Sequence, residues 1–339
     1  MKAFVLNRYG DKDSAALQDH PKPTPKHGEV LIRVAAAGLN PVDYKTREGQ
    51  LKPILRYDLP VVMGNELAGT VEGSVGIDGL PIGTRVFART PKDRMGAFAE
   101  FAVVPYNCIA VMPDELSFEQ AAAIPLAGLT ALQALRDEID LQPGSRVLVT
   151  GGAGGVGTFA IQIAKWLGAE VITTASPRGR ELVERMGADR VIDYTSEKFE
   201  DEIGKVDAVF ELIGGDTLKR AFKVVKKGGM VLSISATPEP QTARKDLDRG
   251  PGLAALFWLV SLPLRLRAWR HGARYRFLFM HPSGEELAEL GQLVRDGRLD
   301  PVVDKVFPFD NIDEAFAYLE KGHAKGKVVV SMEQESGAV

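Results

Sequence analysis

Three glycines in residues 151–157 have the spacing of a turn that binds phosphate groups. An apolar run, residues 146–150, leads into Gly151, Gly154 and Gly157. Glycine at these places permits a tight turn, close approach of the backbone to phosphate, and close packing of a helix on a strand.

Apolar residues recur at helical spacing directly after this turn, from Val156 to Leu167, and Gly168 ends the expected helix. The first helical turn, which includes Gly155 and Val156, offers free backbone N–H groups and the positive end of the helix dipole. A second strand, residues 170–175, follows the helix. This strand–turn–helix–strand context predicts that the glycine turn binds the pyrophosphate of a dinucleotide.

The second strand ends without the carboxylate that binds the ribose 2′-hydroxyl in NAD sites. Thr174 and Ser176 offer hydroxyl groups there instead, and Arg178 and Arg180 follow. A guanidinium group matches phosphate oxygens, and an arginine is unfavourable in the first turn of a helix. We therefore expect NADPH to be the cofactor; the alternative is that the two arginines only solvate the next helix.

The rest of the chain predicts an α/β protein. Its first third contains short β-branched segments bounded by glycine or proline, at residues 29–34, 69–73, 84–88 and 97–104. From Ser117 the pattern changes to helix and then to alternating strand and helix, with strands expected at about residues 146–150, 170–175, 189–193, 206–213 and 230–235. This alternation is typical of a doubly wound parallel sheet, the Rossmann arrangement. From about Gly284 the chain returns to helices and one strand, residues 327–331.

Composition narrows the class of protein. The chain has 339 residues, of which 45% are hydrophobic and 26% charged, and its formal net charge is −3. The negative charge argues against a nucleic-acid binder. The single cysteine, Cys108, excludes an intrachain disulfide framework and a multi-cysteine zinc site, and it is compatible with a reducing compartment. The first ten residues lack the apolar run of a signal peptide, so a cytoplasmic location is expected.

Together with the glycine turn, five further motifs resemble one family along nearly the whole chain. They are residues 36–45 (AAGLNPVDYK), 64–69 (GNELAG), 96–100 (GAFAE), 125–131 (PLAGLTA) and 322–329 (GHAKGKVV). The combination is similar to zinc-independent medium-chain dehydrogenases/reductases of the quinone oxidoreductase type, and most similar to the branch of 2-alkenal and enone reductases.

The resemblance implies two domains with substrate bound in the cleft between them. A GroES-like catalytic domain is expected from residues 1–124 together with 281–339, and a Rossmann NADPH-binding domain from residues 125–280. It also suggests a homodimer.

The same resemblance predicts that no metal is bound. Where the zinc enzymes of the superfamily carry two cysteines and a histidine, this chain has Asn40, Leu126 and Asn65. Amide and leucine side chains do not supply the thiolate and imidazole that tetrahedral zinc prefers, and Glu66 alone makes no site. The four-cysteine structural zinc lobe is also missing.

Without a metal, a group of the protein must stabilise the negative charge that develops on a substrate oxygen. Lys45 is the first candidate, because the resemblance places a lysine here, near the nicotinamide ribose and the substrate. Asn40 and Asp43 are expected to line the same cleft, and Tyr44 offers a phenolic donor. The alternatives are a solvated lysine, helix-capping roles for Asn40 and Asp43, and a packing role for Tyr44.

Further cofactor contacts are expected at strand ends. Ligands of open α/β sheets cross the carboxyl edges of the strands. This rule adds Tyr194, Leu212, Ile213 and Ser233, with a surface role as the alternative for Tyr194. The resemblance adds Thr130 at the nicotinamide end, where a helix threonine bonding its own preceding turn is the alternative. Lys325 and Lys327 also resemble positions near the cofactor, although a solvated charged turn is the more ordinary outcome.

One segment departs from the family pattern. Residues 252–269 are mostly apolar, Pro263 interrupts them, and Arg270, His271, Arg274 and Arg276 follow. The apolar part is shorter than the roughly 20 residues that span a bilayer. Three roles remain open: a lid or wall of the substrate pocket, a dimer surface, or weak contact with a membrane surface through residues 252–276.

The sequence as a whole predicts an NADPH-dependent oxidoreductase that transfers hydride to the activated C=C bond of α,β-unsaturated carbonyl compounds. NADPH:quinone oxidoreduction is the alternative within the same class of enzyme. A low-turnover NADPH-binding structural protein and an ordinary zinc alcohol dehydrogenase are the further alternatives. The expected partners are a small enone, enal or quinone and a second copy of the chain, without nucleic acid.

Overall fold

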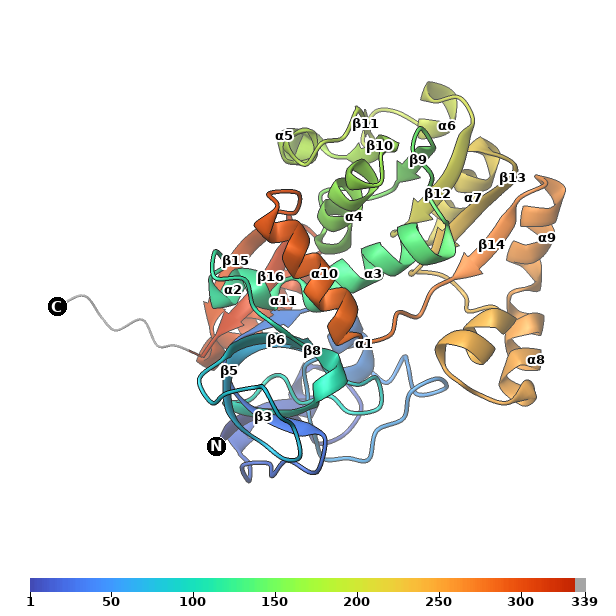
Figure 1. Cartoon of the computed structure of the whole chain (residues 1–339). Coiled ribbons are helices and arrows are strands. Elements are labelled where there is room, and N and C mark those ends of the chain that lie inside the picture. The colour runs from blue at the N-terminus through green and yellow to red at the C-terminus, as the bar shows by residue number, and fades with distance from the viewer. Residues whose placement is uncertain (333–339) are drawn as a thin grey trace. The chain divides into compact units, whose positions relative to one another are not determined.

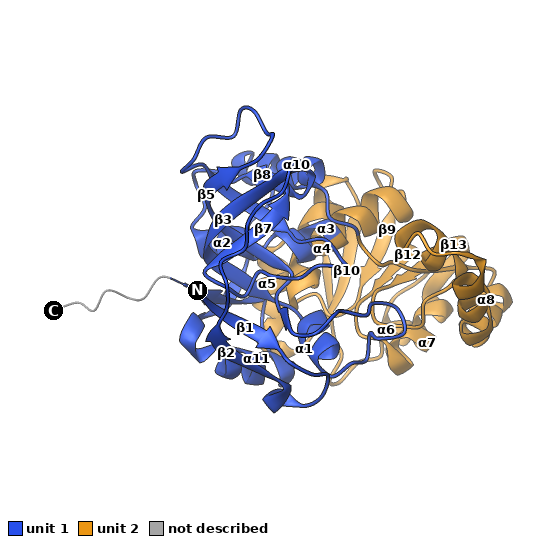
Figure 2. Ribbon diagram, turned by 90° about the horizontal axis from the view of Figure 1, so that it is seen from below, with its two compact units in different colours: residues 1–129, 281–339 blue, residues 130–280 orange. Residues whose placement is uncertain are grey.

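In the computed structural model of the protein, which describes residues 1–332, the chain folds as two units. Unit 1 contains Met1–Leu129 and the residues from His281 onward, and unit 2 contains Thr130–Met280 (Figure 2).

A parallel sheet of six strands forms the centre of unit 2. Its strands are β9 (Arg146–Val149), β10 (Glu170–Ala175), β11 (Arg190–Asp193), β12 (Val206–Glu211), β13 (Val225–Ser233) and β14 (Arg274–Phe277). The central strand β9 is apolar and buried on both faces, since Val147, Leu148 and Val149 expose no surface. This is the pattern of a parallel strand covered by helices on both sides.

Helices connect these strands because parallel neighbours need crossover connections. The helices of unit 2 are α4 (Gly155–Trp166), α5 (Pro177–Arg185), α6 (Phe199–Glu202), α7 (Gly215–Val224), α8 (Pro251–Val260) and α9 (Leu262–Arg270), with π-helical turns at Gln133–Glu138 and Thr242–Asp246. Figure 1 shows α4 and α7 beside the central strands that they contact. An apolar cluster that includes Phe199, Phe222 and Ala268 joins α6, α7 and α9 to the sheet.

The order of the strands, β11-β10-β9-β12-β13-β14, is that of a Rossmann sheet. The chain runs outward from β9 to β11 and then returns to place β12 on the other side of β9. Ligands of such sheets bind at the carboxyl ends of the strands where the order reverses, here between β9 and β12. The predicted fold class is therefore confirmed for this part of the chain.

Unit 1 is mainly β-structure. A seven-stranded sheet has the order β15-β16-β3-β5-β6-β8, with β7 also paired to β3, and a small sheet has the order β2-β1-β4. The strands are β1 (Lys2–Leu6), β2 (Ala15–Asp19), β3 (Glu29–Leu39), β4 (Val61–Val62), β5 (Glu66–Ser74), β6 (Arg85–Arg89), β7 (Phe101–Pro105), β8 (Ile109–Val111), β15 (Val303–Pro308) and β16 (Lys327–Ser331). The two ends of the chain meet here, because β16 pairs antiparallel with β3.

The helices of unit 1 are short and flank the sheets. They are α1 (Pro41–Arg47), α2 (Phe118–Ala122), α3 (Pro125–Leu132, which continues into unit 2), α10 (Gly284–Arg295) and α11 (Ile312–Glu320), with 3-10 turns at Lys12–Ser14, Tyr106–Cys108 and Phe309–Asn311. Phe316 of α11 contacts the rings of Phe4 and Phe98, and all three are fully buried or nearly so. These long-range contacts tie the C-terminal segment to the N-terminal strands.

The apolar segment at residues 252–269 folds as α8 and α9, which are bent by 61° at Ser261. Among residues 1–332, no single helix is long and apolar enough to cross a membrane. The bent pair α8–α9 meets that criterion only when its two helices are taken together, by length and composition.

Candidate active site

The glycine turn lies between β9 and α4, and Thr174 of β10 supports it. The backbone N–H of Gly151 donates to Oγ1 of Thr174 at 2.9 Å, and that of Gly152 donates to the carbonyl of Thr174 at 3.0 Å. Gly151 has φ +68°, a conformation that side-chain-bearing residues rarely adopt. Thr174 therefore shapes the turn from the end of the neighbouring strand, and it is buried.

Close packing explains the glycine at position 157. A Cβ atom there would lie 2.4 Å from the carbonyl oxygen of Gly151 and 2.7 Å from Cα of Gly152. Neither backbone atom can move aside like the end of a side chain, so only glycine lets α4 begin this close to the turn.

The N-terminus of α4 fits a dinucleotide pyrophosphate. Gly154 is the N-cap residue, and because glycine has no side chain it cannot cap the free N–H groups of the helix. The first N–H groups of a helix have no partner within the helix, and those of Gly155, Val156 and Gly157 belong to this turn. Together with the helix dipole, they make a site for an anion. The predicted glycine-turn residues thus lie together in unit 2.

Glu211 organises the neighbouring loops, and sequence reasoning missed it. This fully buried residue ends β12, and its Oε1 accepts hydrogen bonds from the backbone of Ile213 and Gly214 at 2.9 and 2.7 Å. Its Oε2 accepts from the hydroxyl of Ser233 at 2.9 Å. Thr150 completes the group by accepting from the backbone N–H of Leu212 at 2.9 Å. The available signal was an acidic residue that directly follows the apolar run Ala208–Phe210 at the end of the strand.

These contacts bring three predicted cofactor residues to the carboxyl edge of the sheet. Leu212 is half-buried, Ile213 is exposed, and Ser233 is buried on Glu211. A Cβ atom on Gly151 would lie 2.7 Å from Cδ1 of Ile213, so Ile213 closes over the glycine turn. Thr130, on α3, is buried.

Arg178 and Arg180, which follow β10 on α5, differ in their contacts. Ser176 is the N-cap of α5 and makes no side-chain cap hydrogen bond. The guanidinium of Arg180 contacts Glu184 and the carbonyl of Val191, each at 3.4 Å. Arg178 is exposed, and no partner is found for its side chain among residues 1–332. Tyr194, beyond β11, is exposed as well. Arg178 is therefore the arginine that is free to bind a phosphate.

A buried ion pair occupies the centre of the candidate site in unit 1. The ammonium of Lys327 donates to Oε1 of Glu66 at 2.6 Å and to the carbonyl of Leu39 at 3.0 Å. It also donates to Oδ1 of Asn40, whose Nδ2 donates to Oε1 of Glu66 at 2.6 Å. The backbone N–H of Leu126 donates to Oε2 of Glu66 at 2.6 Å. Lys327 is thus a buried partner of Glu66 and not part of a solvated turn.

Asp43 lies under this ion pair at the start of α1. Its two carboxylate oxygens accept from the backbone N–H of Asn40 at 2.7 Å and from Nδ2 of Asn65 at 2.6 Å. Burial raises the pKa of Asp43 to about 6, while the two hydrogen bonds oppose that rise. The buried Arg89, another residue that sequence reasoning missed, donates to the carbonyl of Asn65 at 3.1 Å.

The residues at the expected zinc-ligand positions do not fit a zinc ion. Asn40 and Asn65 are engaged by Lys327 and Asp43, and Leu126 contributes only its backbone N–H. The ammonium of Lys327 would also repel a cation at this place. Within residues 1–332, no group of three or more His, Cys, Asp or Glu side chains is placed to hold a metal ion.

Tyr44 and Lys45 follow on the same short helix α1. Tyr44 is half-buried against the core of unit 1, and burial raises the pKa of its hydroxyl. Lys45 is also half-buried, and its ammonium has no partner among the described residues. Because Asn40 and Asp43 are locked into the buried network, Lys45 is the predicted catalytic residue on α1 with an uncommitted charge.

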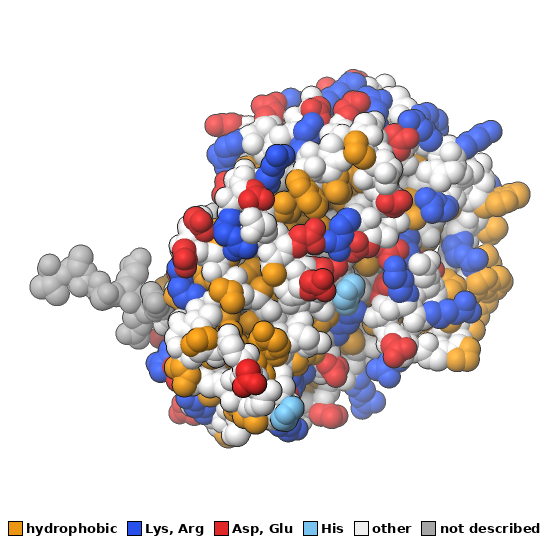
Figure 3. Space-filling view, in the orientation of Figure 1, with side chains coloured by type: hydrophobic (Ala, Val, Ile, Leu, Met, Phe, Trp, Pro, Cys, Tyr) orange, Lys and Arg blue, Asp and Glu red, His pale blue; other side chains and the backbone are white. Residues whose placement is uncertain are grey.

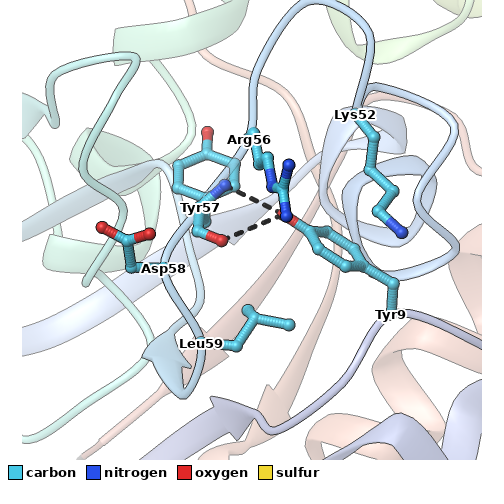
Figure 4. A pocket seen from close by; sticks show the side chains of 6 residues that line it. All are labelled: Tyr9, Lys52, Arg56, Tyr57, Asp58 and Leu59. Atoms are coloured by element: carbon cyan, nitrogen blue, oxygen red, sulfur yellow. Dashed lines mark hydrogen bonds between the residues drawn. The ribbon is translucent and has the colours of Figure 1, made fainter.

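A separate small pocket in unit 1 contains none of the predicted site residues. It has a volume of about 290 Å³ and is lined by Tyr9, Lys52, Arg56, Tyr57, Asp58 and Leu59. The hydroxyl of Tyr9 accepts from the backbone N–H of Tyr57 at 2.9 Å and lies 3.4 Å from the carbonyl of Tyr57 (Figure 4). These bonds fix the loop before β4, so the pocket is explained by local structure.

Two sequence models of protein families match the chain. The one described as alcohol dehydrogenase GroES-like domain matches residues 26–114, and the one described as zinc-binding dehydrogenase matches residues 186–330. The second description names zinc, but this chain has Asn40, Leu126 and Asn65 at the positions where the resemblance places zinc ligands, and Asn40 is hydrogen-bonded to the Lys327–Glu66 pair.

Known proteins resemble the chain along its whole length. It is 34% identical to the NAD(P)H oxidoreductase RTN4IP1, mitochondrial, of Danio rerio, covering 99% of this chain and 92% of the relative. It is 36% identical to the NADPH-dependent alkenal/one oxidoreductase, chloroplastic, of Arabidopsis thaliana, covering 97% and 79%. The solved structure of the quinone oxidoreductase from Coxiella burnetii superposes with a TM-score of 0.84 at 32% identity, covering 98% and 99%. The chain therefore belongs to the medium-chain dehydrogenase/reductase family.

Proposed function

We propose that this protein is an NADPH-dependent oxidoreductase that transfers hydride to the activated C=C bond of 2-alkenals and enones, without zinc. The observation that carries the proposal is the buried Lys327–Glu66 ion pair, which is hydrogen-bonded to Asn40, one of the positions where the family resemblance places a zinc ligand. Alcohol oxidation in zinc dehydrogenases relies on the metal as a Lewis acid. A metal-free site suits an acceptor that is already electron-poor, such as the β-carbon of an enone.

The cofactor is held by unit 2. When bound, NADPH supplies a hydride to the substrate. The N-terminus of α4 and the glycine turn bind its pyrophosphate, and Arg178 with Ser176 and Thr174 receives the 2′-phosphate end. The 36%-identical Arabidopsis relative is named for NADPH dependence, which supports this choice of cofactor.

Lys45 acts on the substrate oxygen. As the β-carbon receives hydride, the electron pair of the C=C bond moves toward the carbonyl oxygen, and an enolate forms. An unpaired ammonium next to that oxygen stabilises its developing charge, and the enolate then takes a proton from water at its α-carbon, which leaves hydroxide to the solvent. Asn40 and Asp43 are positioning residues in this scheme, because they hold the start of α1 through their buried hydrogen bonds. Tyr44 serves as a second donor on α1.

Quinone reduction is the second candidate. A quinone ring also presents a carbonyl conjugated to an electron-poor carbon, so the same cation stabilises the reduced oxygen. The solved quinone oxidoreductase from Coxiella burnetii supports this candidate through its 32% identity and 98% coverage of this chain.

Two further properties belong to the proposal. We infer that the enzyme works as a homodimer, as the family resemblance suggests. We also infer that it works in the cytoplasm, with support from its single buried cysteine, which suits a reducing compartment.

A panel of acceptors tests the function. NADPH oxidation is followed by absorbance with trans-2-alkenals, cyclic enones, 1,4-naphthoquinone, a saturated alcohol with NADP⁺, and no substrate. The proposal expects the highest kcat/KM with the alkenals and enones. A preference for naphthoquinone would select quinone reduction instead. Background rates with every acceptor, despite tight NADPH binding, would show a low-turnover binding protein and contradict the proposal.

A further inference from the structure

Helices α8 and α9 expose an unusual amount of apolar surface. Trp269, Leu259 and Trp258 are 76%, 61% and 46% exposed. Six of the thirteen exposed large hydrophobic side chains among the described residues lie on these two helices: Leu256, Trp258, Leu259, Val260, Leu266 and Trp269. We call these six residues the helical-pair surface. Single exposed apolar residues are ordinary, but a group of six marks a binding surface.

The chain around this surface is strongly basic. From Arg249 to Gly284 it contains six arginines and no aspartate or glutamate, although the whole protein has a net charge of −3. One of the six, Arg276, is buried in ion pairs with Glu138, Glu239 and Asp246. Of the other five, Arg265, Arg267 and Arg270 lie on α9, while Arg249 precedes α8 and Arg274 follows α9 in the chain. Figure 3 shows hydrophobic and basic side chains gathered together over the part of the molecule where Figure 1 places α8 and α9.

The lengths of α8 and α9 and the bend between them fit helices that lie on a membrane surface and do not cross the bilayer. Helices of ten and nine residues are each about 15 Å long or less, half the thickness of a bilayer's hydrocarbon core. The 61° bend prevents them from acting as one straight span. Helix α9 combines leucine and tryptophan with arginine, the composition of helices that lie in the plane of the membrane interface, and α8 supplies further exposed apolar side chains.

A cavity beside α9 adds a place for anionic headgroups. It has a volume of about 600 Å³, and its lining includes Lys245, Arg265, Trp269 and Arg274. Nη1 of Arg265 is buried and has no hydrogen-bond partner among the described residues, while its guanidinium lies 5.6 Å from the ring of Trp258. Two acidic residues also line the cavity, and both are already paired: Glu138 with Lys245 and Arg276, and Asp137 with Arg136. An unpaired guanidinium in such a place matches a phosphate group.

We propose that the helical-pair surface binds the face of an anionic lipid bilayer. The apolar side chains enter the boundary between headgroups and acyl chains, and the arginines around them contact lipid phosphates. A second copy of the chain fits less well. A two-fold interface through this surface places the same arginines of both copies against one another, and like charges repel. The inference does not depend on which reaction the enzyme catalyses.

Vesicle flotation of the full-length protein tests this inference. Two sets of vesicles are compared: pure phosphatidylcholine, and phosphatidylcholine with about 30 mol% phosphatidylserine, which carries the negative surface potential that attracts basic segments. We expect the protein to float with the anionic vesicles only and to be released by high salt. Brominated lipids should quench tryptophan fluorescence in the bound state, because Trp258 and Trp269 then contact the acyl chains.

Two double variants measure separately how the apolar side chains and the arginines contribute to vesicle binding. Leu259→Ser combined with Trp269→Ser should lower the partition coefficient by at least about tenfold, from the burial of apolar area that is lost. Ile82→Ser is the matched control, because Ile82 is equally exposed (76%) but lies in unit 1. Arg267→Gln combined with Arg270→Gln keeps the apolar surface and should weaken binding about fivefold per arginine. Far-UV circular dichroism of each variant verifies that it is folded.

Two results would overturn the inference. The first is no flotation of the wild-type protein with anionic vesicles. If the Leu259→Ser/Trp269→Ser variant then also shifts from dimer to monomer in sedimentation, the surface is an interface between copies. The second is undiminished flotation of both double variants.

Discussion

At the scale of residues, α1 and its N-cap carry side chains that are held in buried hydrogen bonds and one lysine whose charge has no partner among the described residues. Asp43 and the preceding Asn40 are buried and fully occupied by hydrogen bonds to Asn65, Glu66 and Lys327. Lys45, two positions after Asp43, has an uncommitted ammonium. The network holds the helix, and the proposed chemistry falls to the residue that the network leaves free.

Replacing Lys45 by alanine tests that division. We expect kcat with a cyclic enone to fall by about 10²-fold, since the charge that stabilises the developing enolate is lost. The dissociation constant for NADPH, measured by fluorescence titration, should change by less than about threefold, because Lys45 acts on the transition state and not on the binding of the cofactor. Lys12→Ala, an exposed lysine in the same unit, serves as the control. An unchanged kcat removes Lys45 from the mechanism.

Asp43 makes the stability of the protein depend on pH. Its pKa in the folded state is about 6, above the usual 3.8, because the buried carboxylate is poorly solvated. The folded state therefore holds this proton more tightly than the unfolded state does. The stability that comes from the proton is complete below about pH 4 and is lost as the pH rises through 6.

Asp43→Asn cannot ionise, so it should gain stability relative to the wild type as the pH rises. We expect a relative gain of up to about 3 kcal/mol in the free energy of unfolding between pH 4 and pH 8, from a shift of about two pKa units. Urea unfolding at the two pH values measures it. The exposed Asp13→Asn variant is the control and should show no such trend. A constant difference for Asp43→Asn would contradict the raised pKa.

At the scale of elements, the cofactor site depends on how β9, α4, β10 and α5 meet. Gly157 lets α4 begin against the turn, and Thr174 of β10 holds the same turn from the side. The carboxyl end of β10 then leads into α5, where Arg178 is free and Arg180 is engaged by Glu184 and Val191. The pyrophosphate and the 2′-phosphate thus have different elements to bind them.

Gly157→Ala should separate α4 from the turn. The new Cβ would meet backbone atoms at 2.4 and 2.7 Å. We expect NADPH binding to weaken by at least about tenfold and the free energy of unfolding to fall by roughly 1–3 kcal/mol, as in other overpacked sites. Calorimetric titration and urea unfolding measure the two effects. In the control Gly252→Ala, the Cβ meets nothing within 4 Å. Equal affinity in Gly157→Ala would show that phosphate does not bind at this turn.

Arg178→Ala tests the choice between the two nicotinamide cofactors. Loss of a charge-assisted hydrogen bond to the 2′-phosphate should raise the KM for NADPH about 10- to 100-fold and leave the KM for NADH unchanged. Arg185→Ala, at the opposite end of α5, is the matched control. If both KM values change equally, or neither changes, Arg178 does not bind the 2′-phosphate.

At the scale of the whole molecule, unit 1 is built from the two ends of the chain, whereas unit 2 is one continuous segment. Lys327 meets Glu66 across 261 positions, and β16 pairs with β3 from the other end of the sequence. This long-range pairing brings an ammonium against Asn40, one of the positions where the family resemblance places a zinc ligand. The cost of desolvating both charges is offset because each also has hydrogen bonds to Leu39, Asn40 or Leu126.

Treatment with a metal chelator should therefore change neither the activity nor the stability of the enzyme. We expect incubation with a chelator, followed by gel filtration, to leave kcat and the melting temperature unchanged, since the Lys327–Glu66 pair leaves no ligands for zinc. Elemental analysis of the purified protein should find zinc well below one ion per chain. Stoichiometric zinc, or activity that returns only when zinc is added, would refute a metal-free mechanism.

Much of the fold followed from local patterns. The strands expected at residues 170–175 and 327–331 have those bounds in the structure, and the helix after the glycine turn lies within a residue or two of its expected position. Strand β14 was not expected, because its sequence, Arg-Tyr-Arg-Phe, looks too charged for a sheet. Arg276 is buried there only because Glu138, Glu239 and Asp246 neutralise it.

The amino-acid sequence by itself determined the phosphate-binding turn, the alternation of strands and helices, and the family, since these depend on neighbouring residues and short spacings. Only the tertiary structure decided that Lys327 pairs with Glu66, that Glu211 organises the cofactor edge, and that Asp43 is buried enough to raise its pKa. The reason is physical. The solvation and partners of a charged side chain are set by elements that are distant in the chain, and no local pattern records them.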